Sequence, residues 1–238
     1  MEPQQSSKFN LSPSISIIIA GVIIAGAVVF ASKQPSPQPV AANPQQPAAV
    51  AVDVTKVETT GEPFIGNANA PVTIAYWYDY QCPFCQRNEQ TAMPQIIKDY
   101  VDTGKAKIVF KDYQFLSEDS QRLGKVSRAV WETAPDKFYA WHKAVYDNQG
   151  TENTGWATDA KILSITTGVL GAADAQKVIQ LAAKNTDAYQ KEMDADKAEG
   201  TALGISGTPA SIIGKQLVSG AQPYAAFQSA IEAALVGK

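Results

Sequence analysis

The two cysteines are the residues of this sequence best suited to do chemistry. Cys82 and Cys85 are the only cysteines among 238 residues, and both stand in the stretch YQCPFCQRNE. Two thiols cannot build a disulfide framework or a four-thiolate zinc site in one chain. The C-x-x-C spacing therefore leaves a redox pair, a two-ligand metal site or a short structural disulfide. The last is disfavoured, because the entropy gained by closing a loop grows with loop length.

A redox pair needs a feature that lowers the pKa of its attacking thiol, since the thiolate is the nucleophile and free cysteine has a pKa of about 8.5. The unpaired N–H groups and macrodipole at the start of a helix provide this feature. We predict that Cys82, exposed at a helix start, is the nucleophile and that Cys85, one turn further in, is the resolving thiol. Pro83 suits the first helical position, where its missing N–H costs no hydrogen bond.

The segments around the pair predict a strand before it and a helix after it. Residues 71–80, PVTIAYWYDY, are rich in the β-branched and aromatic side chains typical of strands. Apolar residues then recur at helical spacing as far as Gly104, with a kink expected at Pro94. Residues 106–113 predict a second strand. The cysteines are thus expected at the strand-to-helix junction of a βαβ unit.

The rest of the folded region predicts a helical block followed by a ββα unit. From about residue 117 to 203 the apolar spacing is helical throughout. SIIG and QLVSG then predict a hairpin, and a final helix is expected to open at Pro223. Residues 50–57, which precede the strand predicted at 71–80, alternate between apolar and other side chains in a way that allows an edge strand. These patterns predict an α/β fold.

The N-terminal part combines a long apolar run with a Pro/Gln-rich tract. Residues 15–31 approach the roughly 20 apolar residues that span a bilayer. We expect a transmembrane anchor or uncleaved signal there, after a short cytoplasmic segment of residues 1–14. A cleaved secretory signal is the competing interpretation, because residues 29–31 read VFA. Residues 32–60 are interpreted as a Pro/Gln-rich linker that includes the edge strand.

Composition limits the classes of partner. The chain is 45% hydrophobic and 18% charged, which is typical of a globular protein with a substantial core. Its formal net charge is −3, so the basic surface that a nucleic acid requires is not expected.

Four segments together resemble the DsbA-like thiol:disulfide oxidoreductases, which are thioredoxin folds with an inserted helical domain. The segments are APVTIAYWYDYQCPFC, IVFKDY, WHKAVYDNQ and LGISGTPASIIGKQLVSGAQPYAAF. The resemblance implies a thioredoxin domain at residues 61–238 with a helical insertion at about 117–203. It also implies that the redox group is a Cys82–Cys85 disulfide, with no separate cofactor and no metal.

The resemblance assigns roles that composition does not reveal. It implies that Pro83 and Phe84 form the active-site loop and that Thr208 and Pro209 bind substrate. In this fold the residue before a cis-proline faces the cysteine pair, and its backbone pairs with the substrate polypeptide. On the residues alone, GTP is equally consistent with an ordinary turn.

Two positions depart from the family pattern. Many relatives carry a buried acidic residue six positions before the first cysteine, where this chain has Tyr76. Deprotonation of Cys85 is then expected to depend on water or on another group. The most oxidising members have histidine where this chain has Phe84, so thiolate stabilisation should depend more on the helix terminus.

Other polar residues receive structural interpretations. His142 lies on an apolar helical face and is expected to be a hydrogen-bonded core histidine rather than a catalytic one. Asp79 matches a family acid, but an exposed turn or cap residue at a strand end is an equal alternative. Lys111 and Asp112 match a family pair, with a solvated strand end as the alternative. A solvated helix face is expected for Asp194, Asp196 and Glu199.

The leading hypothesis is a membrane-anchored protein disulfide oxidase with its domain outside the cell membrane. Its expected partners are unfolded or reduced secreted proteins and, by resemblance, a quinone-linked membrane oxidoreductase that recharges the pair. An oxidising compartment suits thiol pairs that act on protein disulfides. The alternatives are a reductase or isomerase of the same fold, and a non-enzymatic tethered module that binds peptide or carries copper.

Overall fold

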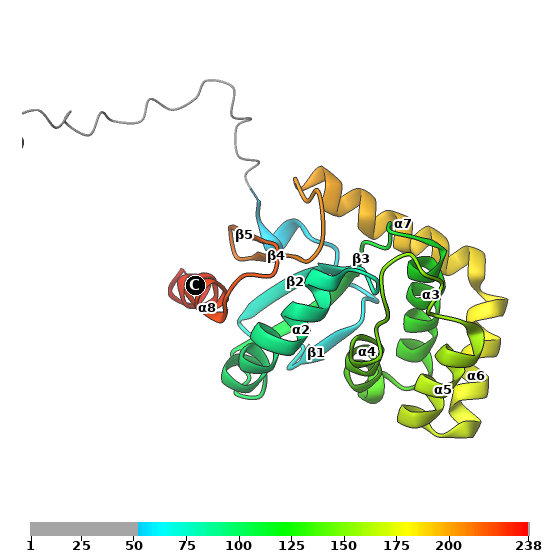
Figure 1. Cartoon of the computed structure of the whole chain (residues 1–238). Helices are drawn as coiled ribbons and strands as arrows, with labels where there is room; N and C mark the ends of the chain where they lie inside the picture. The colour runs from blue at the N-terminus through cyan, green and yellow to red at the C-terminus, as the bar shows by residue number, and fades with distance from the viewer. Residues whose placement is uncertain (1–51, 238) are drawn as a thin grey trace, which may run out of the picture. The chain divides into compact units, whose positions relative to one another are not determined.

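A mixed five-stranded sheet forms the centre of the fold in a computed structural model that describes residues 52–237 (Figure 1). The strand order is β1-β3-β2-β4-β5. β2 and β3 are parallel, whereas the other neighbouring pairs are antiparallel. The strands are β1 (Phe64–Gly66), β2 (Val72–Tyr78), β3 (Ala106–Asp112), β4 (Ala210–Ile213) and β5 (Gln216–Ser219).

β2 is buried on both faces, and its alternating side chains enter two different clusters. Ile74, Tyr76 and Tyr78 point into the larger cluster, together with apolar residues of α2 (Pro83–Ile96), α4 (Phe138–Asp147) and α8 (Tyr224–Val236). Ala75 and Trp77 enter a smaller cluster on the opposite face. This follows from the two-residue period of a strand, and it places Tyr76 on the same face as the helix that carries the cysteines.

The predicted βαβ unit is confirmed. α2 connects the parallel strands β2 and β3, and Pro83 is its first residue. Pro94 lies inside α2, which continues into a π-helical turn, η2 (Ile97–Val101). Gly104 then ends the run with a φ of +72°, a conformation that glycine adopts readily.

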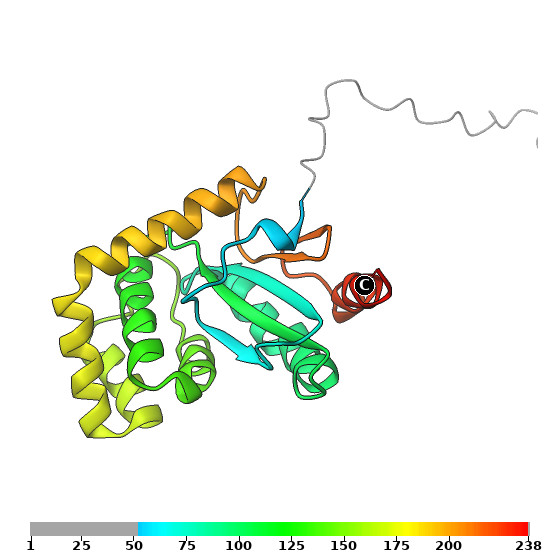
Figure 2. The ribbon, with the colours of Figure 1, turned by 180° about the vertical axis from the view of Figure 1, so that it is seen from behind.

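The predicted helical insertion is also confirmed, and it extends from α3 to α7. Figure 2 shows these helices grouped at one side of the sheet, with α7 returning toward it. Ser117 caps the first helix by accepting a hydrogen bond from the Asp119 amide at 3.1 Å. Besides α4 and the 3₁₀ turn η3 (Pro135–Lys137), the block contains α3 (Glu118–Thr133), α5 (Asp159–Leu170), α6 (Ala172–Lys184) and α7 (Thr186–Ala202).

The C-terminal ββα unit forms as predicted, but the edge strand expected at residues 50–57 is wrong for the residues that are described. These fold into a 3₁₀ turn, η1 (Val54–Lys56). The Asp53 carboxylate accepts hydrogen bonds from the Thr55 amide and hydroxyl, at 3.0 and 2.8 Å, and this local pairing competes with a strand. The Val54 amide donates to the Gly214 carbonyl at 2.8 Å, which fixes η1 beside the β4–β5 hairpin (Figure 2).

A buried cluster of charges joins the insertion to the sheet. It corrects the expectation of a solvated Asp196 and excludes the alternative of a solvated strand end for Lys111 and Asp112. Lys111 and Asp112 of β3 and Asp196 of α7 are at most 3% exposed. The Asp196 carboxylate binds Lys111 Nζ and Arg128 Nη2, each at 2.5 Å, and Arg128 Nε also binds Asp112 at 2.8 Å. Burial and then the charge of Asp196 raise the pKa of Glu62, the next carboxyl in the cluster, to about 8.

Most of the N-terminal predictions lie outside the described residues. These are the cytoplasmic segment at 1–14, the anchor at 15–31 and the linker as far as residue 51. Within residues 52–237, every helix is too short or too polar to cross a membrane.

Candidate active site

Cys82 is the N-cap residue of α2, as the spacing predicts. Its backbone is extended, with a ψ of 118°, and its amide donates to the Asp79 carbonyl at 3.1 Å. Cys82 and Cys85 are both free thiols. The expectation of an exposed nucleophile is wrong in degree, because Cys82 is only 5% exposed and Cys85 is fully buried. The loop before β4 covers Cys82 and contacts it through Thr208.

The two thiols have opposite electrostatic environments. Hydrogen bonding from the Cys85 thiol, opposed by burial and helped by Thr208, lowers the pKa of Cys82 to about 6. The amides of Phe84 and Cys85, at the start of α2, act in the same direction. Burial raises the pKa of Cys85 well above its usual value, and the neighbouring Cys82 adds to this effect. Near neutral pH the pair therefore carries a thiolate at Cys82 and a thiol at Cys85.

Thr208 and Pro209 lie against the first cysteine, and the peptide bond between them is cis. The Cys82 thiol donates to the Thr208 carbonyl at 3.3 Å. Sheet register explains this approach, because Ala210 at the start of β4 pairs with Trp77 near the end of β2. The residues just before β4 must then lie beside those that follow β2. The structure thus brings together the two segments that the resemblance connects.

Asp79 holds the turn that presents the cysteines. It is fully buried, so the alternative of an exposed turn residue is wrong about its exposure, although the residue does lie at a turn. Its carboxylate accepts hydrogen bonds from four groups. The donors are the amides of Gln81, Phe115 and Leu116 and the hydroxyl of Ser120, at 2.8, 2.8, 3.1 and 2.6 Å.

Two residues of the insertion bind the backbone of the same turn. The Tyr146 hydroxyl donates to the Asp79 carbonyl at 3.0 Å. The Gln149 side chain donates to the Tyr80 carbonyl at 2.7 Å. Both residues belong to the WHKAVYDNQ segment, which explains in physical terms why that segment accompanies the cysteine motif.

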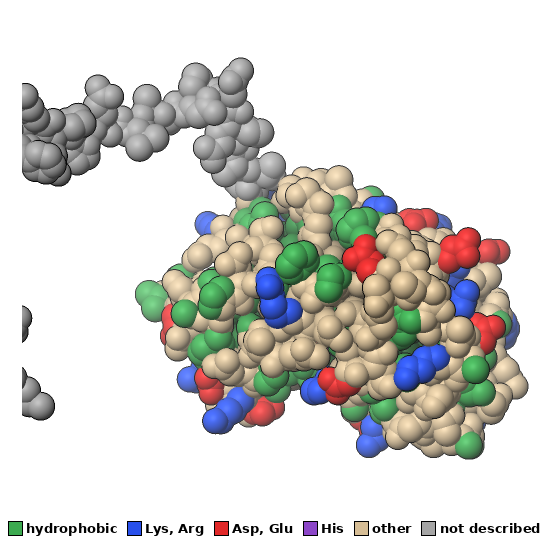
Figure 3. Space-filling model, in the orientation of Figure 1, with side chains coloured by type: hydrophobic (Ala, Val, Ile, Leu, Met, Phe, Trp, Pro, Cys, Tyr) green, Lys and Arg blue, Asp and Glu red, His purple; other side chains and the backbone are tan. Residues whose placement is uncertain are grey.

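Two exposed aromatic rings belong to segments next to the cysteine pair. Phe84 is 52% exposed and Phe115 is 43% exposed. The Arg87 guanidinium lies 4.9 Å from the centre of the Phe84 ring, within the range of a cation–π contact. Figure 3 shows hydrophobic side chains together with basic side chains and neutral surface over the part of this face where α2 lies.

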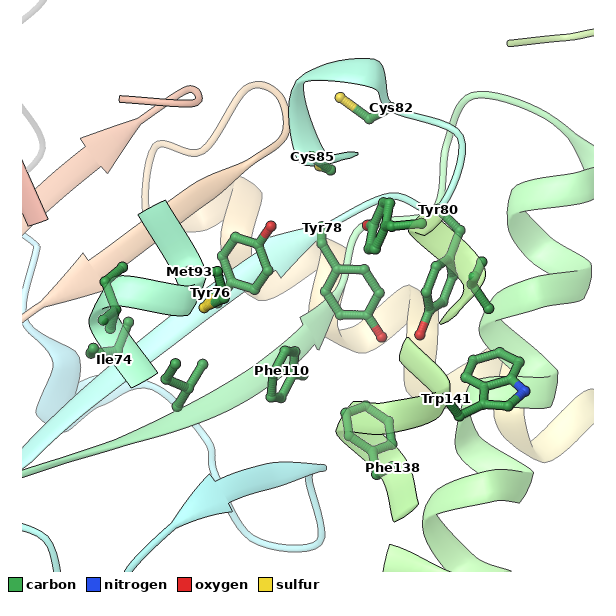
Figure 4. Packing of buried hydrophobic residues seen from close by; sticks show 14 of the residues in the cluster. Ile74, Tyr76, Tyr78, Tyr80, Cys82, Cys85, Met93, Phe110, Phe138 and Trp141 are labelled. Atoms are coloured by element: carbon green, nitrogen blue, oxygen red, sulfur yellow. The ribbon is translucent and has the colours of Figure 1, made fainter. Parts of the chain in front are cut away.

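Tyr76, in place of the family acid, lies beneath the pair among the aromatic side chains of the core (Figure 4). It is fully buried, and its hydroxyl has no hydrogen-bond partner among residues 52–237. Asn88 is also fully buried, and neither polar atom of its side chain is paired within the described part of the chain. The face of α2 behind Cys85 is therefore polar as well as buried.

His142 is a hydrogen-bonded core histidine, as expected. It is fully buried, with Nδ1 3.0 Å from the Tyr80 hydroxyl and Nε2 3.3 Å from Glu89 Oε1. Glu89 is 1% exposed, and the sequence analysis missed it. Its position four residues after Cys85 on one helix was the available signal, since residues at that spacing share a face.

Within the described residues, no group of three or more histidine, cysteine or acidic side chains is arranged to hold a metal ion.

Comparisons with known proteins place the chain in a family. The model of the thioredoxin family matches residues 58–233. Disulfide bond formation protein D of Bacillus subtilis is 28% identical over 180 residues, which cover 75% of this chain and 79% of the relative. The probable disulfide bond formation protein D of Bacillus cereus is 25% identical over 161 residues, covering 65% and 71%.

Two solved structures share the fold. Oxidised BdbD from Bacillus subtilis superposes with a TM-score of 0.70 at 23% identity, covering 79% of this chain and 99% of that one. DsbA of Chlamydia trachomatis gives a TM-score of 0.66 at 18% identity, covering 74% and 93%. With its cysteine pair at the start of α2 and its helical insertion, this chain belongs to the thioredoxin family and is a DsbA-like protein disulfide oxidoreductase.

Proposed function

We propose that this oxidoreductase works as an oxidase, which introduces disulfide bonds into secreted or surface proteins. The observation that supports this direction is the difference between the two thiols, with the pKa of Cys82 lowered to about 6 and that of Cys85 raised. A stabilised Cys82 thiolate favours the reduced form of the pair. A pair whose reduced form is stabilised gives up its disulfide readily to other thiols.

In the proposed reaction, a thiolate of the substrate attacks Cys82 Sγ of the Cys82–Cys85 disulfide. The bond between the two cysteines breaks, and Cys85 leaves as a thiolate that takes up a proton. A second substrate thiolate then attacks the substrate sulfur of the mixed disulfide, and Cys82 leaves as a thiolate. The substrate loses two electrons and gains a disulfide, while the pair becomes reduced. The Cys82–Cys85 disulfide itself accepts the two electrons, so the proposed reaction uses no separate redox cofactor.

Thr208 and Pro209 are proposed to bind the substrate polypeptide beside Cys82. The contact between Cys82 Sγ and the Thr208 carbonyl, at 3.3 Å, supports this assignment, because a substrate sulfur bonded to Cys82 would bring its own backbone alongside. The exposed rings of Phe84 and Phe115 are proposed to contact apolar side chains of unfolded substrates.

The cellular setting is proposed from the sequence. Residues 15–31 would anchor the chain in the cell membrane as a single span, with residues 1–14 inside and the domain on the extracytoplasmic side. On that side of the membrane, the proposed substrates are reduced secreted proteins. A quinone-linked membrane oxidoreductase would accept the electrons from the reduced pair.

The reduction potential of the full chain in detergent tests the proposed direction. The pair is equilibrated with glutathione buffers and its oxidised fraction is measured. A value of about −120 to −180 mV supports the oxidase. A value near about −270 mV overturns it and indicates a reductase, the alternative that the absence of an imidazole at Phe84 favours.

A further inference from the structure

The Asp79 carboxylate joins two loops of the molecule, because it accepts hydrogen bonds from both. Its Oδ1 accepts from the Gln81 amide at 2.8 Å, inside the turn that leads to Cys82. Its Oδ2 accepts from the amides of Phe115 and Leu116 at 2.8 and 3.1 Å, in the loop between β3 and α3. One fully buried side chain therefore holds the turn before the cysteines and the loop after β3 together.

The backbone of Asp79 also fixes the first cysteine. The Asp79 carbonyl accepts from the Cys82 amide at 3.1 Å, which closes the turn over residues 79–82. The Tyr146 hydroxyl donates to the same carbonyl at 3.0 Å. Asp79 is thus bonded to Cys82 through its carbonyl and to Phe115 through its carboxylate, so that a movement of Asp79 would shift both residues.

A second set of contacts connects the Phe115 ring to the loop that carries Thr208. The ring packs edge-to-face on Tyr113, with 5.5 Å between the ring centres. The Tyr113 hydroxyl donates to the Ile205 carbonyl at 3.0 Å, three residues before Thr208. Phe115 is therefore tied to both of the segments that meet at the cysteine pair, the turn before the first cysteine and the loop before the cis-proline.

The Phe115 ring is exposed although its backbone is fixed. Four large apolar side chains are exposed in the described part of the chain, and Phe84 and Phe115 are the two that belong to segments next to the cysteines. An apolar ring on a backbone that is already ordered loses little conformational freedom when a partner covers it. The arrangement is that of a preformed contact for an apolar group.

We propose that Asp79 is a positioning residue for the substrate: it fixes the Phe115 ring relative to Cys82, so that the ring binds an apolar side chain close to the substrate cysteine. The proposal rests on the oxidase function, in which a substrate thiolate attacks Cys82. The preferred substrate is then a reduced, unfolded polypeptide with apolar residues beside its cysteine. Asp79 takes no part in the bond changes at sulfur and acts through the position of Phe115.

Asp79→Asn should break this connection whichever way the new amide is oriented. An amide has one oxygen, and its NH₂ group only donates. If the NH₂ group takes the place of Oδ1, the Gln81 amide loses its acceptor. If it takes the place of Oδ2, the amides of Phe115 and Leu116 lose theirs. In either case one side chain no longer holds the turn before Cys82 and the Phe115 loop together.

The kinetic test compares two short peptides that differ only in having leucine or serine on both sides of a single cysteine. Stopped flow at neutral pH measures how fast each reduced peptide opens the Cys82–Cys85 disulfide of the full chain in detergent. Each rate constant is divided by that of the same peptide with hydroxyethyl disulfide, a small neutral disulfide, which removes differences in intrinsic thiol reactivity. The wild type should favour the leucine peptide about fivefold, as expected for partial burial of a leucine side chain.

Phe115→Ala and Asp79→Asn should each lower this preference about threefold. The double variant should lower it no further, because both changes remove the same contact. Asp53→Asn is the matched control, since Asp53 also accepts from a backbone amide, that of Thr55 at 3.0 Å, but lies in the segment beside the β4–β5 turn. It should keep the wild-type preference.

Amide hydrogen exchange of the wild type, followed by NMR for each residue, tests the positioning without a variant. The amides of Gln81, Phe115 and Leu116 should exchange slowly and with similar protection, because one buried carboxylate holds all three. In Asp79→Asn, protection should be lost either at Gln81 or at Phe115 and Leu116. Rapid exchange of Phe115 and Leu116 in the wild type overturns the proposal, even if Asp79→Asn does not fold.

The kinetic outcomes separate this proposal from the oxidase function. If both peptides open the wild-type disulfide without a preference, or if Phe115→Ala keeps the preference, the Phe115 contact is wrong and the oxidase function stands. If Asp79→Asn slows both peptides equally, Asp79 has only a structural role and the positioning is overturned. If neither peptide opens the wild-type disulfide, the oxidase function fails as well.

Discussion

The sulfur of Cys82 lies 3.3 Å from the carbonyl oxygen of Thr208, although 126 positions separate these residues in the chain. The contact exists because β4 pairs with β2 and so returns the chain to the helix start. The Thr208 hydroxyl is buried and unpaired within the described part of the chain, and Thr208 helps to lower the pKa of Cys82. This residue therefore influences the thiol through its side chain as well as its backbone.

Replacing Thr208 by valine should raise the pKa of Cys82 above about 6, because the isosteric side chain lacks the hydroxyl that is free to donate once Cys82 is ionised. The expected rise is about one unit, the size of one hydrogen bond. Ultraviolet absorbance of the thiolate, followed against pH in the reduced protein, measures it. Thr201→Val serves as a control for the loss of a hydroxyl elsewhere. An unchanged pKa in Thr208→Val would remove this residue from the site.

The stability of the reduced protein should depend on pH through Cys82. Its folded pKa is about 6, below its ordinary value of 9.0. The contribution is fully present above about pH 9 and is lost as pH falls through about 6, so it grows across this window. Urea unfolding of reduced wild type and of Cys82→Ser at several pH values measures the difference. A difference that is constant from pH 6 to 9 would contradict the lowered pKa.

Arg128→Met should destabilise the fold by about 3–5 kcal/mol, because the buried carboxylates of Asp112 and Asp196 would lose their shared cation. Lys177→Met removes an exposed ion pair with Asp174 and should change stability by less than about 1 kcal/mol. Urea unfolding of both variants provides the comparison. Equal effects would mean that the cluster does not behave as buried charge.

Two glycines of helices should respond to alanine in opposite directions. A Cβ at Gly200 would lie 2.7 Å from the indole nitrogen of Trp77, so Gly200→Ala should cost about 1–3 kcal/mol. Gly168 in α5 has open space around it, so Gly168→Ala should stabilise the fold by about 0.5–1 kcal/mol. Thermal unfolding distinguishes them, and a stabilising Gly200→Ala would contradict the close packing of α7 on the sheet.

Phe84→His should make the pair more oxidising, because an imidazole in the active-site loop would add a donor to the Cys82 thiolate. The expected result is a lower pKa of Cys82 and a less negative reduction potential, measured in glutathione buffers. Phe84→Leu, which keeps an apolar side chain, is the control. If both variants shift the potential equally, the effect comes from loss of the ring and its contact with Arg87.

The sequence was sufficient to predict the elements whose signals are local. A βαβ unit was predicted from the β-branched strand before Cys82, the helical spacing after Cys85 and the second strand. The structure contains this unit. The position of Thr208 beside Cys82 came from family resemblance, because no local pattern reports which distant segments become neighbours.

Residues whose environment is set by tertiary packing were predicted poorly. Lys111 and Asp196 look solvated in sequence, and their burial depends on α7 returning to β3. Residues 50–57 alternate like a strand, but the Asp53 side chain binds the Thr55 amide and favours a turn. The burial of Glu89 was not predicted, because an acidic residue in a helix is usually exposed and its partner His142 is far away in the chain.

Arg128 binds carboxylates from β3 and α7, and also the Glu62 carboxylate from the segment before β1. The helical insertion is therefore not a removable module. An exchange of insertions between relatives would have to carry the matching strand residues with it, since either half alone would bury charges that lack their partners. Chimaeras that cross this boundary should fail to fold unless Lys111, Asp112 and Glu62 travel together with α3 and α7.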